Sequence, residues 1–268
     1  MLKKRLIPVL LLQNGLLVRS ELFKIHQIIG NPIIEVQRFN EWNVDELIYL
    51  DITCEGAYDL RREDHKIKNL SEPLAILNAV SETCFMPLTW GGRIRTLEDM
   101  RVRFANGADK IAINTIAFDR PSIITEAARA FGSQAVVVSM DAKRVQDNRL
   151  EIYVAGGRRA TGLRPSEWAR QVESFGAGEI LLQSIDHDGT GEGYDVDLIA
   201  EVASSVRIPV IACSGVGQFE HYADGIHAGA SAAAAANIWH FKDLADRQGK
   251  RAMARAGIEV RQNPESGR

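Results

Sequence analysis

The chain has 268 residues, of which 46% are hydrophobic and 25% charged, an ordinary composition for a globular protein. Its 32 basic and 35 acidic side chains give a net charge of −3, so no basic excess is available to neutralise nucleic-acid phosphates. The three cysteines, at irregular spacing, exclude a disulfide framework and a cysteine-based zinc site, and they predict a reducing, cytoplasmic location.

The amino terminus has a basic start and a short apolar run at residues 6–12, which superficially looks like a signal peptide. An Asn-Gly turn at 14–15 closes the run and no small-residue cleavage site follows, so we interpret it as a buried strand. No stretch reaches the roughly 18 apolar residues that a membrane span needs, and we therefore predict no membrane partner.

Short apolar runs alternate with amphipathic helical patterns along the chain. The predicted strands are residues 6–11, 46–52, 86–90, 110–114, 135–140, 179–184, 209–213 and 231–236. The predicted helices are residues 32–42, 72–84, 96–106, 121–131, 165–175, 197–205, 218–228 and 241–249. This alternation predicts a parallel sheet with right-handed crossovers, and units of about 33 residues fit a closed (β/α)8 TIM barrel. An open doubly wound sheet is the alternative, although no glycine-rich phosphate loop follows the first strand.

The two halves of the chain repeat each other. Residues 107–115 align with 229–237, residues 86–93 with 208–215, and residues 46–51 with 179–184. We therefore predict one barrel at 1–257, made of half-barrels at about 1–134 and 135–257, with a flexible tail at 258–268. A polar loop at 54–69 and a predicted hairpin at 147–161 interrupt the repeat, and both follow strand carboxyl ends.

Carboxylates and one amide occur at or just beyond the predicted carboxyl ends of the strands, where barrel enzymes place their active sites. These residues are Asp51, Asn114, Asp141, Asp186 and Asp188. Like charges and partial burial separate the pKa values of neighbouring carboxyl groups, which suits one of them to general acid–base catalysis. The alternative is that some of these side chains only cap helices or bind loop amides.

Three turns are candidates for phosphate binding, because glycine lets backbone amides approach an anion closely. They are Gly91-Gly92, Ser214-Gly215 and the turn at 236–237. The internal repeat relates the first two turns, which indicates a ligand with two phosphates; ordinary turn glycines are the alternative. The same repeat aligns 137–141 with 7–11, so the apolar Leu11 is the counterpart of Asp141.

Four charged residues stand at the predicted amino ends of strands, on the floor of the barrel. They are Arg5, Glu46, Lys110 and Glu179. Two cations and two anions could form a closed ring there, but spacing alone favours scattered surface pairs of little energetic value.

Several motifs together are specific enough to indicate a family. They include GADK at 107–110, INT at 113–115, DAKR at 141–144, GAGE at 176–179 and DGT at 188–190. With these motifs the sequence resembles the cyclase subunit of imidazole glycerol phosphate synthase, over about residues 1–250. That family is a (β/α)8 barrel that binds a glutaminase on its amino-terminal face. Ammonia passes through the barrel to the opposite mouth, where it cleaves and cyclises a bis-phosphorylated ribonucleotide.

The resemblance implies a role for each matching residue. Asp141 matches the catalytic aspartate of the fifth strand, and Asp109 matches a position that contacts the glutaminase. The four floor charges match a salt-bridge gate for ammonia, which replaces the interpretation as scattered pairs. The expected substrate and phosphate site comprises Arg19, Asp51, Gly91, Gly92, Asn114, Asp188, Gly189, Ser214, Gly215 and Asn237. No cofactor is implied, and the six histidines lack metal-ligand spacing.

The departures from the family pattern are concentrated at the mouth. Leu11 replaces the other catalytic aspartate, Arg93 replaces the third glycine of a phosphate turn, Arg19 replaces a loop lysine, and Asn237 replaces a phosphate-binding serine. The loop after the first strand is unusually apolar, and the loop at 54–69 is longer than usual.

These departures leave three functions open. One is a divergent paralog that delivers ammonia to a separate sugar amidotransferase on the carboxyl face, for acetamidino-sugar formation in surface polysaccharide. The others are a genuine cyclase of histidine biosynthesis and a scaffold that activates the glutaminase.

Overall fold

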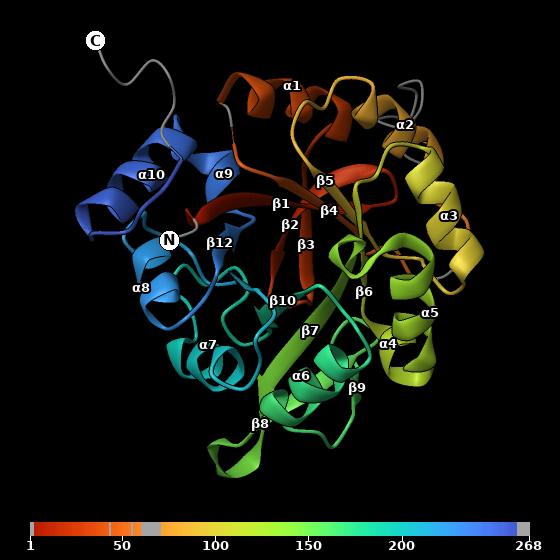
Figure 1. The fold of residues 1–268 in the computed structure, drawn as a ribbon. Helices are drawn as coiled ribbons and strands as arrows, with labels where there is room; N and C mark the ends of the chain where they lie inside the picture. Colours follow the sequence, from red (N-terminus) through yellow and green to blue (C-terminus); the bar gives the residue numbers. More distant parts are fainter. Residues whose placement is uncertain (1–2, 43, 55, 60–70, 262–268) are drawn as a thin grey trace.

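Eight parallel strands form a closed barrel in the computed structural model, which describes residues 3–42, 44–54, 56–59 and 71–261. The barrel strands are β1 (Arg5–Gln13), β4 (Leu47–Asp51), β5 (Leu88–Gly91), β6 (Lys110–Ile113), β7 (Val136–Arg144), β10 (Glu179–Ser184), β11 (Val210–Cys213) and β12 (Ala232–Ala235). Each pairs with the next, β12 pairs with β1, and pairing of β7 with β10 completes the ring (Figure 1). The predicted (β/α)8 barrel is confirmed.

Helices surround the barrel on its outer side (Figure 1). They are α1 (Pro32–Trp42), α2 (Pro73–Ser81), α3 (Leu97–Ala105), α4 (Thr115–Asp119), α5 (Ser122–Phe131), α6 (Pro165–Ser174), α7 (Val196–Ala203), α8 (His221–His227), α9 (Ile238–Phe241) and α10 (Ala245–Arg255). Single 3-10 turns lie at Ser133–Ala135 and Gln146–Asn148. Local sequence sets some of the helix starts. Thr96 and Asp99 form a reciprocal capping box at α3, and Pro165 occupies the first turn of α6.

Apolar side chains fill both faces of the strands, which explains why the strand sequences are almost continuously hydrophobic. One cluster lies between the strands and the helices, and a second contains side chains of the barrel interior such as Ile7, Val9, Ile48, Val137 and Leu181. Removal of this surface from water is the main term that stabilises the fold.

The chain departs from the expected elements near its carboxyl terminus. The helix expected at 241–249 is two helices, α9 and α10, because Leu244 adopts a left-handed conformation (φ 50°) between them. Ile258 and Val260 are buried, and Val260 forms a β-bridge with Lys4. Packing against the barrel therefore continues beyond the expected boundary at 257, and the rest of the expected tail, 262–268, lies outside the described residues.

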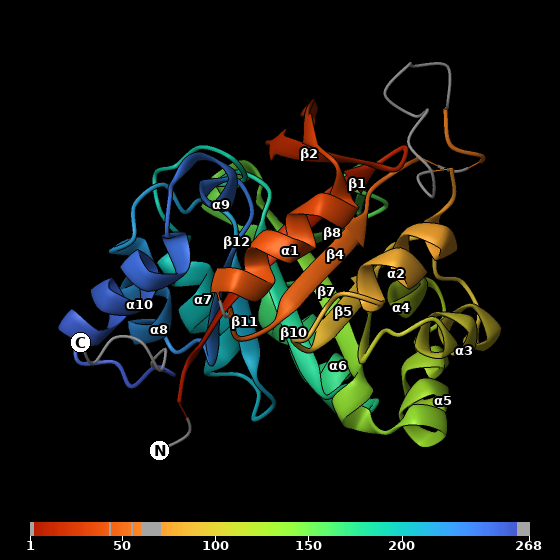
Figure 2. The same cartoon turned by 90° about the horizontal axis from the view of Figure 1, so that it is seen from above.

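Two hairpins extend the barrel on the side of the strand carboxyl ends. The apolar segment after β1 forms the hairpin β2 (Leu16–Glu21) and β3 (Ile25–Gly30), with β2 paired to the end of β1 (Figure 2). The hairpin expected after the fifth strand is confirmed as β8 (Leu150–Val154) and β9 (Arg159–Ala160). Most of the expected loop at 54–69 lies outside the described residues. Among the described helices, none has the length and apolarity to cross a membrane.

Candidate active site at the barrel mouth

A cavity of about 1190 Å³ opens at the carboxyl ends of the barrel strands. The residues expected at the mouth line it, except Gly91, which is buried within β5, and Asp186. The lining residues come from both halves of the chain, and residues as distant as Arg19 and Asn237 contribute to one surface. A concave site of this size accommodates an elongated small molecule.

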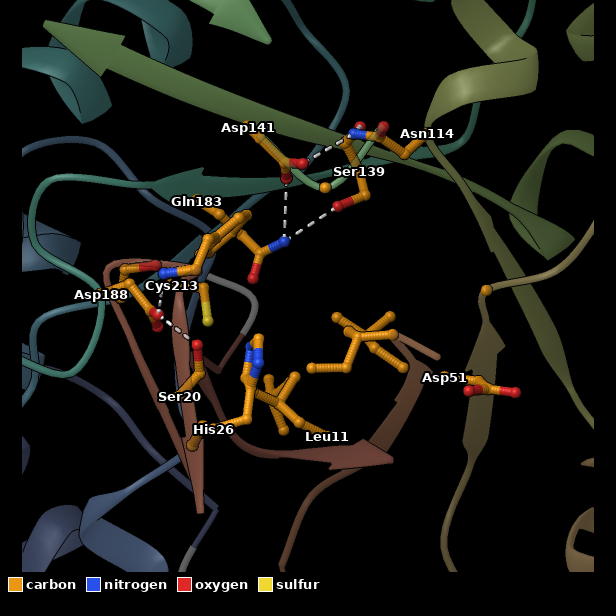
Figure 3. A pocket seen from close by; sticks show the side chains of 18 of the residues that line it. Leu11, Ser20, His26, Asp51, Asn114, Ser139, Asp141, Gln183, Asp188 and Cys213 are labelled. Atoms are coloured by element: carbon orange, nitrogen blue, oxygen red, sulfur yellow. Dashed lines mark hydrogen bonds between the residues drawn. The ribbon is translucent and has the colours of Figure 1, made fainter. Parts of the chain in front are cut away.

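Asp141 lies at the centre of the polar wall of the cavity (Figure 3). Its carboxylate accepts hydrogen bonds from Asn114 Nδ2 at 3.2 Å and from Gln183 Nε2 at 3.0 Å, and Gln183 also donates to Ser139 Oγ at 3.2 Å. Burial raises the pKa of Asp141 to about 7; the charge of Asp188 adds to this, and the two amide donors oppose it. Near neutral pH both protonation states are populated, as a general acid or base requires.

Asp188 and Asp51 occupy opposite sides of the cavity (Figure 3). Asp188 Oδ2 accepts from Ser20 Oγ at 2.6 Å and from the Phe23 amide at 3.1 Å, which ties the β2–β3 hairpin to the loop after β10. Asp51 accepts from Tyr58 Oη at 2.7 Å and from the Thr53 amide at 3.0 Å. Burial raises the pKa of both carboxyl groups, and these hydrogen bonds oppose the shift.

Leu11 lines the same cavity but brings no polar atom to it. The side chain is 8% exposed and belongs to the apolar cluster of the barrel interior. It stands next to Leu50 of β4 in the strand register, and Figure 3 shows it between Asp188 and Asp51. The asymmetry expected from the internal repeat is therefore present in space: Asp141 faces the cavity without an acidic counterpart at position 11.

The glycine turns at the mouth have no room for a side chain. A Cβ on Gly92 would lie 2.1 Å from the Asp51 carbonyl oxygen, and one on Gly215 would lie 2.0 Å from the carbonyl oxygen of Gly193. Both residues have positive φ angles, 91° and 92°. Two buried oxygens nearby, Ser214 Oγ and Asn237 Oδ1, have no hydrogen-bond partner among the described residues. The part of the mouth around Ser214 and Asn237 therefore offers polar atoms that could form hydrogen bonds with a bound ligand.

Arg93 changes the other glycine turn. It adopts a left-handed conformation (φ 55°), and its guanidinium lies 5.4 Å from the centre of the Tyr58 ring and donates to the Gly56 carbonyl. Arg103 donates to the Arg93 carbonyl at 3.0 Å and holds this backbone in place. A cationic side chain therefore lines the mouth beside Asp51, where the family pattern has a glycine.

The floor of the barrel carries a closed ring of ion pairs. Arg5 pairs with Glu46 at 2.6 Å and also with Glu179, while Lys110 Nζ lies 3.1 Å from Glu46 and 2.8 Å from Glu179. The pKa of Arg5 is raised: burial alone would lower it, but Glu179 and Glu46 outweigh that effect. Spacing alone favoured scattered surface pairs, and that interpretation is wrong because the barrel brings all four strand starts together.

Three of the expected residues make hydrogen bonds within the protein. Asp186 does not line the cavity, and its carboxylate accepts from the Arg144 amide at 2.6 Å, as the alternative of loop-amide binding anticipates. Asp109 is exposed on the floor and accepts from the Leu88 amide at 2.8 Å. Arg19 donates to Gln27 at 2.6 Å within the hairpin.

Sequence reasoning missed several residues of the site: Ser139, Gln183, His26 and Tyr58. Gln183 and Ser139 are polar positions in otherwise apolar strands, a signal that could have identified them. Nothing local indicates the side chains of His26, which comes from the β2–β3 hairpin, and Tyr58, which comes from the loop after β4. No group of three metal-ligating side chains occurs in the part of the chain that the structure describes.

Comparison with known proteins identifies the family. The model of the family described as histidine biosynthesis protein matches residues 5–245. The chain is 41% identical over 264 residues to "Imidazole glycerol phosphate synthase subunit HisF" of Gluconacetobacter diazotrophicus, covering 98% of each chain. It is 42% identical over 264 residues to the protein of the same name from Alkaliphilus metalliredigens, covering 97% of this chain and 100% of the relative. With its barrel and its mouth, the chain belongs to the histidine biosynthesis protein family.

Proposed function

We propose that the chain is the ammonia-receiving barrel subunit of a glutamine-dependent complex, with a glutaminase on its floor. The observation that carries this proposal is the placement of two charged arrangements at opposite ends of one barrel. The closed ring of Arg5, Glu46, Lys110 and Glu179 crosses the floor, and Asp141 stands at the mouth. A ring of paired charges can open and close around a small neutral molecule, and the carboxyl group above can then exchange protons with it.

The floor also offers a surface for the glutaminase. Asp109, at a position that the resemblance assigns to this contact, is exposed next to Lys110 of the ring. Phe85, which precedes β5 as Asp109 precedes β6, is 88% exposed, an unusual exposure for an aromatic ring. Exposed apolar side chains with neighbouring charges are typical of protein interfaces.

The first candidate for the reaction at the mouth is cyclisation of the bis-phosphorylated ribonucleotide in histidine biosynthesis. The names of the full-length relatives at 41% and 42% identity support it. In this reaction Asp141 would act as the acid–base group. The hydroxyl of Ser214, together with the backbone amides of the nearby glycine turn, would bind one of the two phosphates. Asn237 donates its Nδ2 to the Ser20 carbonyl at 2.9 Å instead.

The second candidate is delivery of ammonia for acetamidino-sugar formation in surface polysaccharide, and Leu11 is the observation that favours it. An apolar side chain at this position cannot transfer a proton, and loss of one acid–base group commonly costs about 10²–10⁴-fold in rate. The hairpin at the mouth also exposes Leu22, Ile25 and Ile28, the most exposed of which, Ile25, is 53% exposed. Such a patch suits a protein partner such as a sugar amidotransferase.

One assay separates the candidates. The chain is supplied with ammonium chloride and the bis-phosphorylated ribonucleotide, and imidazole glycerol phosphate is measured, with Asp141→Asn as the inactive control. Turnover at an ordinary enzymatic rate, on the order of 1 s⁻¹ or more, supports the cyclase and contradicts the second candidate. Absence of turnover, with glutamine hydrolysis by a co-purified glutaminase still stimulated by the chain, supports the second candidate.

The same complex tests the scaffold alternative. If the chain conducts ammonia, Lys110→Ala changes the ratio of glutamine-dependent to ammonium-dependent product formation. If the chain only activates the glutaminase, Lys110→Ala leaves that ratio unchanged. If the wild type has no cyclase activity, Leu11→Asp alone should not create it, because Arg93 still replaces the third glycine of the phosphate turn after Gly92.

A further inference from the structure

The β2–β3 hairpin places a histidine over the mouth. His26 is directly opposite Ser20 in the strand register, so the two side chains share one face of the hairpin. That face is turned to the cavity, while the neighbours of His26 in sequence, Ile25 and Gln27, are exposed. Figure 3 shows the imidazole ring beside Leu11, pointing into the cavity toward the wall that holds Asp141. His26 is the one histidine among the described residues that line this cavity.

The hairpin that carries His26 is anchored through Asp188. Ser20 Oγ and the Phe23 amide donate to one carboxylate oxygen of Asp188, and the Leu22 amide donates to its carbonyl at 2.9 Å. These bonds hold the end of β2 and the following turn against the loop after β10. The hairpin is therefore a supported part of the cavity wall, and His26 is held by it rather than by a free loop.

The environment favours the neutral imidazole. Burial lowers the pKa of His26, and the negative charge of Asp188 opposes this only in part. The other charged or titratable side chains of the cavity wall nearby are Arg19, Lys24, Asp141, Cys213 and Lys242. Glu21 acts on the ring only indirectly, through its charge on Asp188. Because burial outweighs the charge of Asp188, His26 is available as a base near neutral pH.

We propose that His26 is the second proton-transfer group of this cavity, working opposite Asp141 and supplying the role that Leu11 cannot fill. This inference rests on the proposed function, in which ammonia reaches an acceptor at this mouth. Two titratable groups on separate walls, one a carboxyl group and one an imidazole, form the acid and base that such a reaction needs. The hairpin, rather than the first barrel strand, then supplies the base.

The proton balance of the step is simple when ammonia adds to a carbonyl carbon of the acceptor. A new N–C bond forms from the nitrogen lone pair, and the π pair of the C=O bond moves to oxygen. The protonated carboxyl group of Asp141 gives its proton to that oxygen, and neutral His26 takes the proton that the new ammonium nitrogen loses. Proton exchange with water restores both groups, and no oxidant or reductant takes part.

The test uses the whole chain with ammonium chloride and the bis-phosphorylated ribonucleotide. We expect His26→Gln to lower kcat by about 10²-fold while KM changes less than about twofold. The wild-type kcat should fall as the pH drops below the pKa of His26, and this acid limb should disappear in His26→Gln. His227→Gln, at an exposed histidine of α8 that does not line the cavity, is the matched control and should keep wild-type kinetics. Equal kcat and an unchanged acid limb in His26→Gln would overturn the proposal while leaving the proposed function intact.

A second measurement applies if the wild type does not turn over the ribonucleotide, a result that counts against the cyclase candidate. NMR titration of the imidazole resonances, assigned with His26→Gln, measures the pKa of His26 directly. The proposal expects a value below the ordinary 6.5, which falls further in Asp188→Asn because a neighbouring negative charge is lost. An ordinary value that does not respond to Asp188→Asn would describe a solvated surface histidine and overturn the proposal.

Discussion

The charged ring on the barrel floor gives the sharpest prediction about stability. Lys110→Met removes one cation from a ring in which Lys110 Nζ contacts Glu46 at 3.1 Å and Glu179 at 2.8 Å. The side chains are largely buried, with 19% of Lys110, 10% of Glu46 and 9% of Glu179 exposed. Water therefore cannot readily replace the lost cation.

The magnitude follows from the contacts. Two charge-assisted hydrogen bonds are worth about 1.5–3 kcal/mol each when lost. Arg5 still pairs with both carboxylates, and the methionine stem keeps most of the lysine's apolar contacts, so the full sum is not expected. We expect the free energy of unfolding to fall by about 2–3 kcal/mol in Lys110→Met.

The assay is urea unfolding followed by both tryptophan fluorescence and circular dichroism, so that coincident transitions justify a two-state free energy. Arg101→Met is the matched control. Its partner Glu98 lies 3.3 Å away, but the two side chains are 62% and 72% exposed, and we expect a change below about 0.5 kcal/mol. A loss in Lys110→Met no larger than in Arg101→Met would refute the reasoning that the ring is a buried, cooperative arrangement.

Three further predictions concern the mouth and the helical layer. Asp141→Asn should stabilise the chain more at pH 8 than at pH 5, by roughly 2–3 kcal/mol in the free energy of unfolding. The pKa of Asp141 in the folded chain, about 7, lies above its value in the unfolded chain, so the wild type loses stability as the pH rises toward 7. Equal effects of the substitution at both pH values in urea unfolding would contradict this. Gly92→Ala should lower the free energy of unfolding by at least about 2 kcal/mol, because a clash with the Asp51 carbonyl adds to a strained φ. Gly257→Ala, at a residue with φ 79° and open space around it, should lower it by only about 1 kcal/mol. Similar melting temperatures for the two variants would argue against the close approach of Gly92 to Asp51. Lys250→Met removes the ammonium group that lies 3.0 Å from the buried Asp45 carboxylate, and it should lower the free energy of chemical unfolding by about 3–5 kcal/mol. A neutral effect would mean that the hydrogen bond from the Leu6 amide alone compensates this carboxylate.

The barrel itself could be predicted from local patterns. Eight apolar runs separated by amphipathic segments are buried on both faces, and that requirement leaves a signature in each run by itself. The strand-end residues Asp141 and Asn114 and the glycine turns were predictable for the same reason, because carboxyl ends of parallel strands meet at one edge. The exact ends of elements were not. Leu244 separates α9 from α10 through a single backbone conformation that its residue type does not favour.

The sequence by itself therefore determined which residue types stand at the two ends of each strand. It also showed that Leu11 stands where an aspartate was expected. The tertiary structure decided which of them touch. Arg5 and Glu179 are 174 positions apart, and only barrel closure makes them partners. Ser20 binds Asp188 across 168 positions, which turns the apolar hairpin toward the cavity and brings His26 to it. Burial and hydrogen bonding then set the pKa of Asp141, because both depend on the neighbours that the fold assembles rather than on the residue's place in the chain.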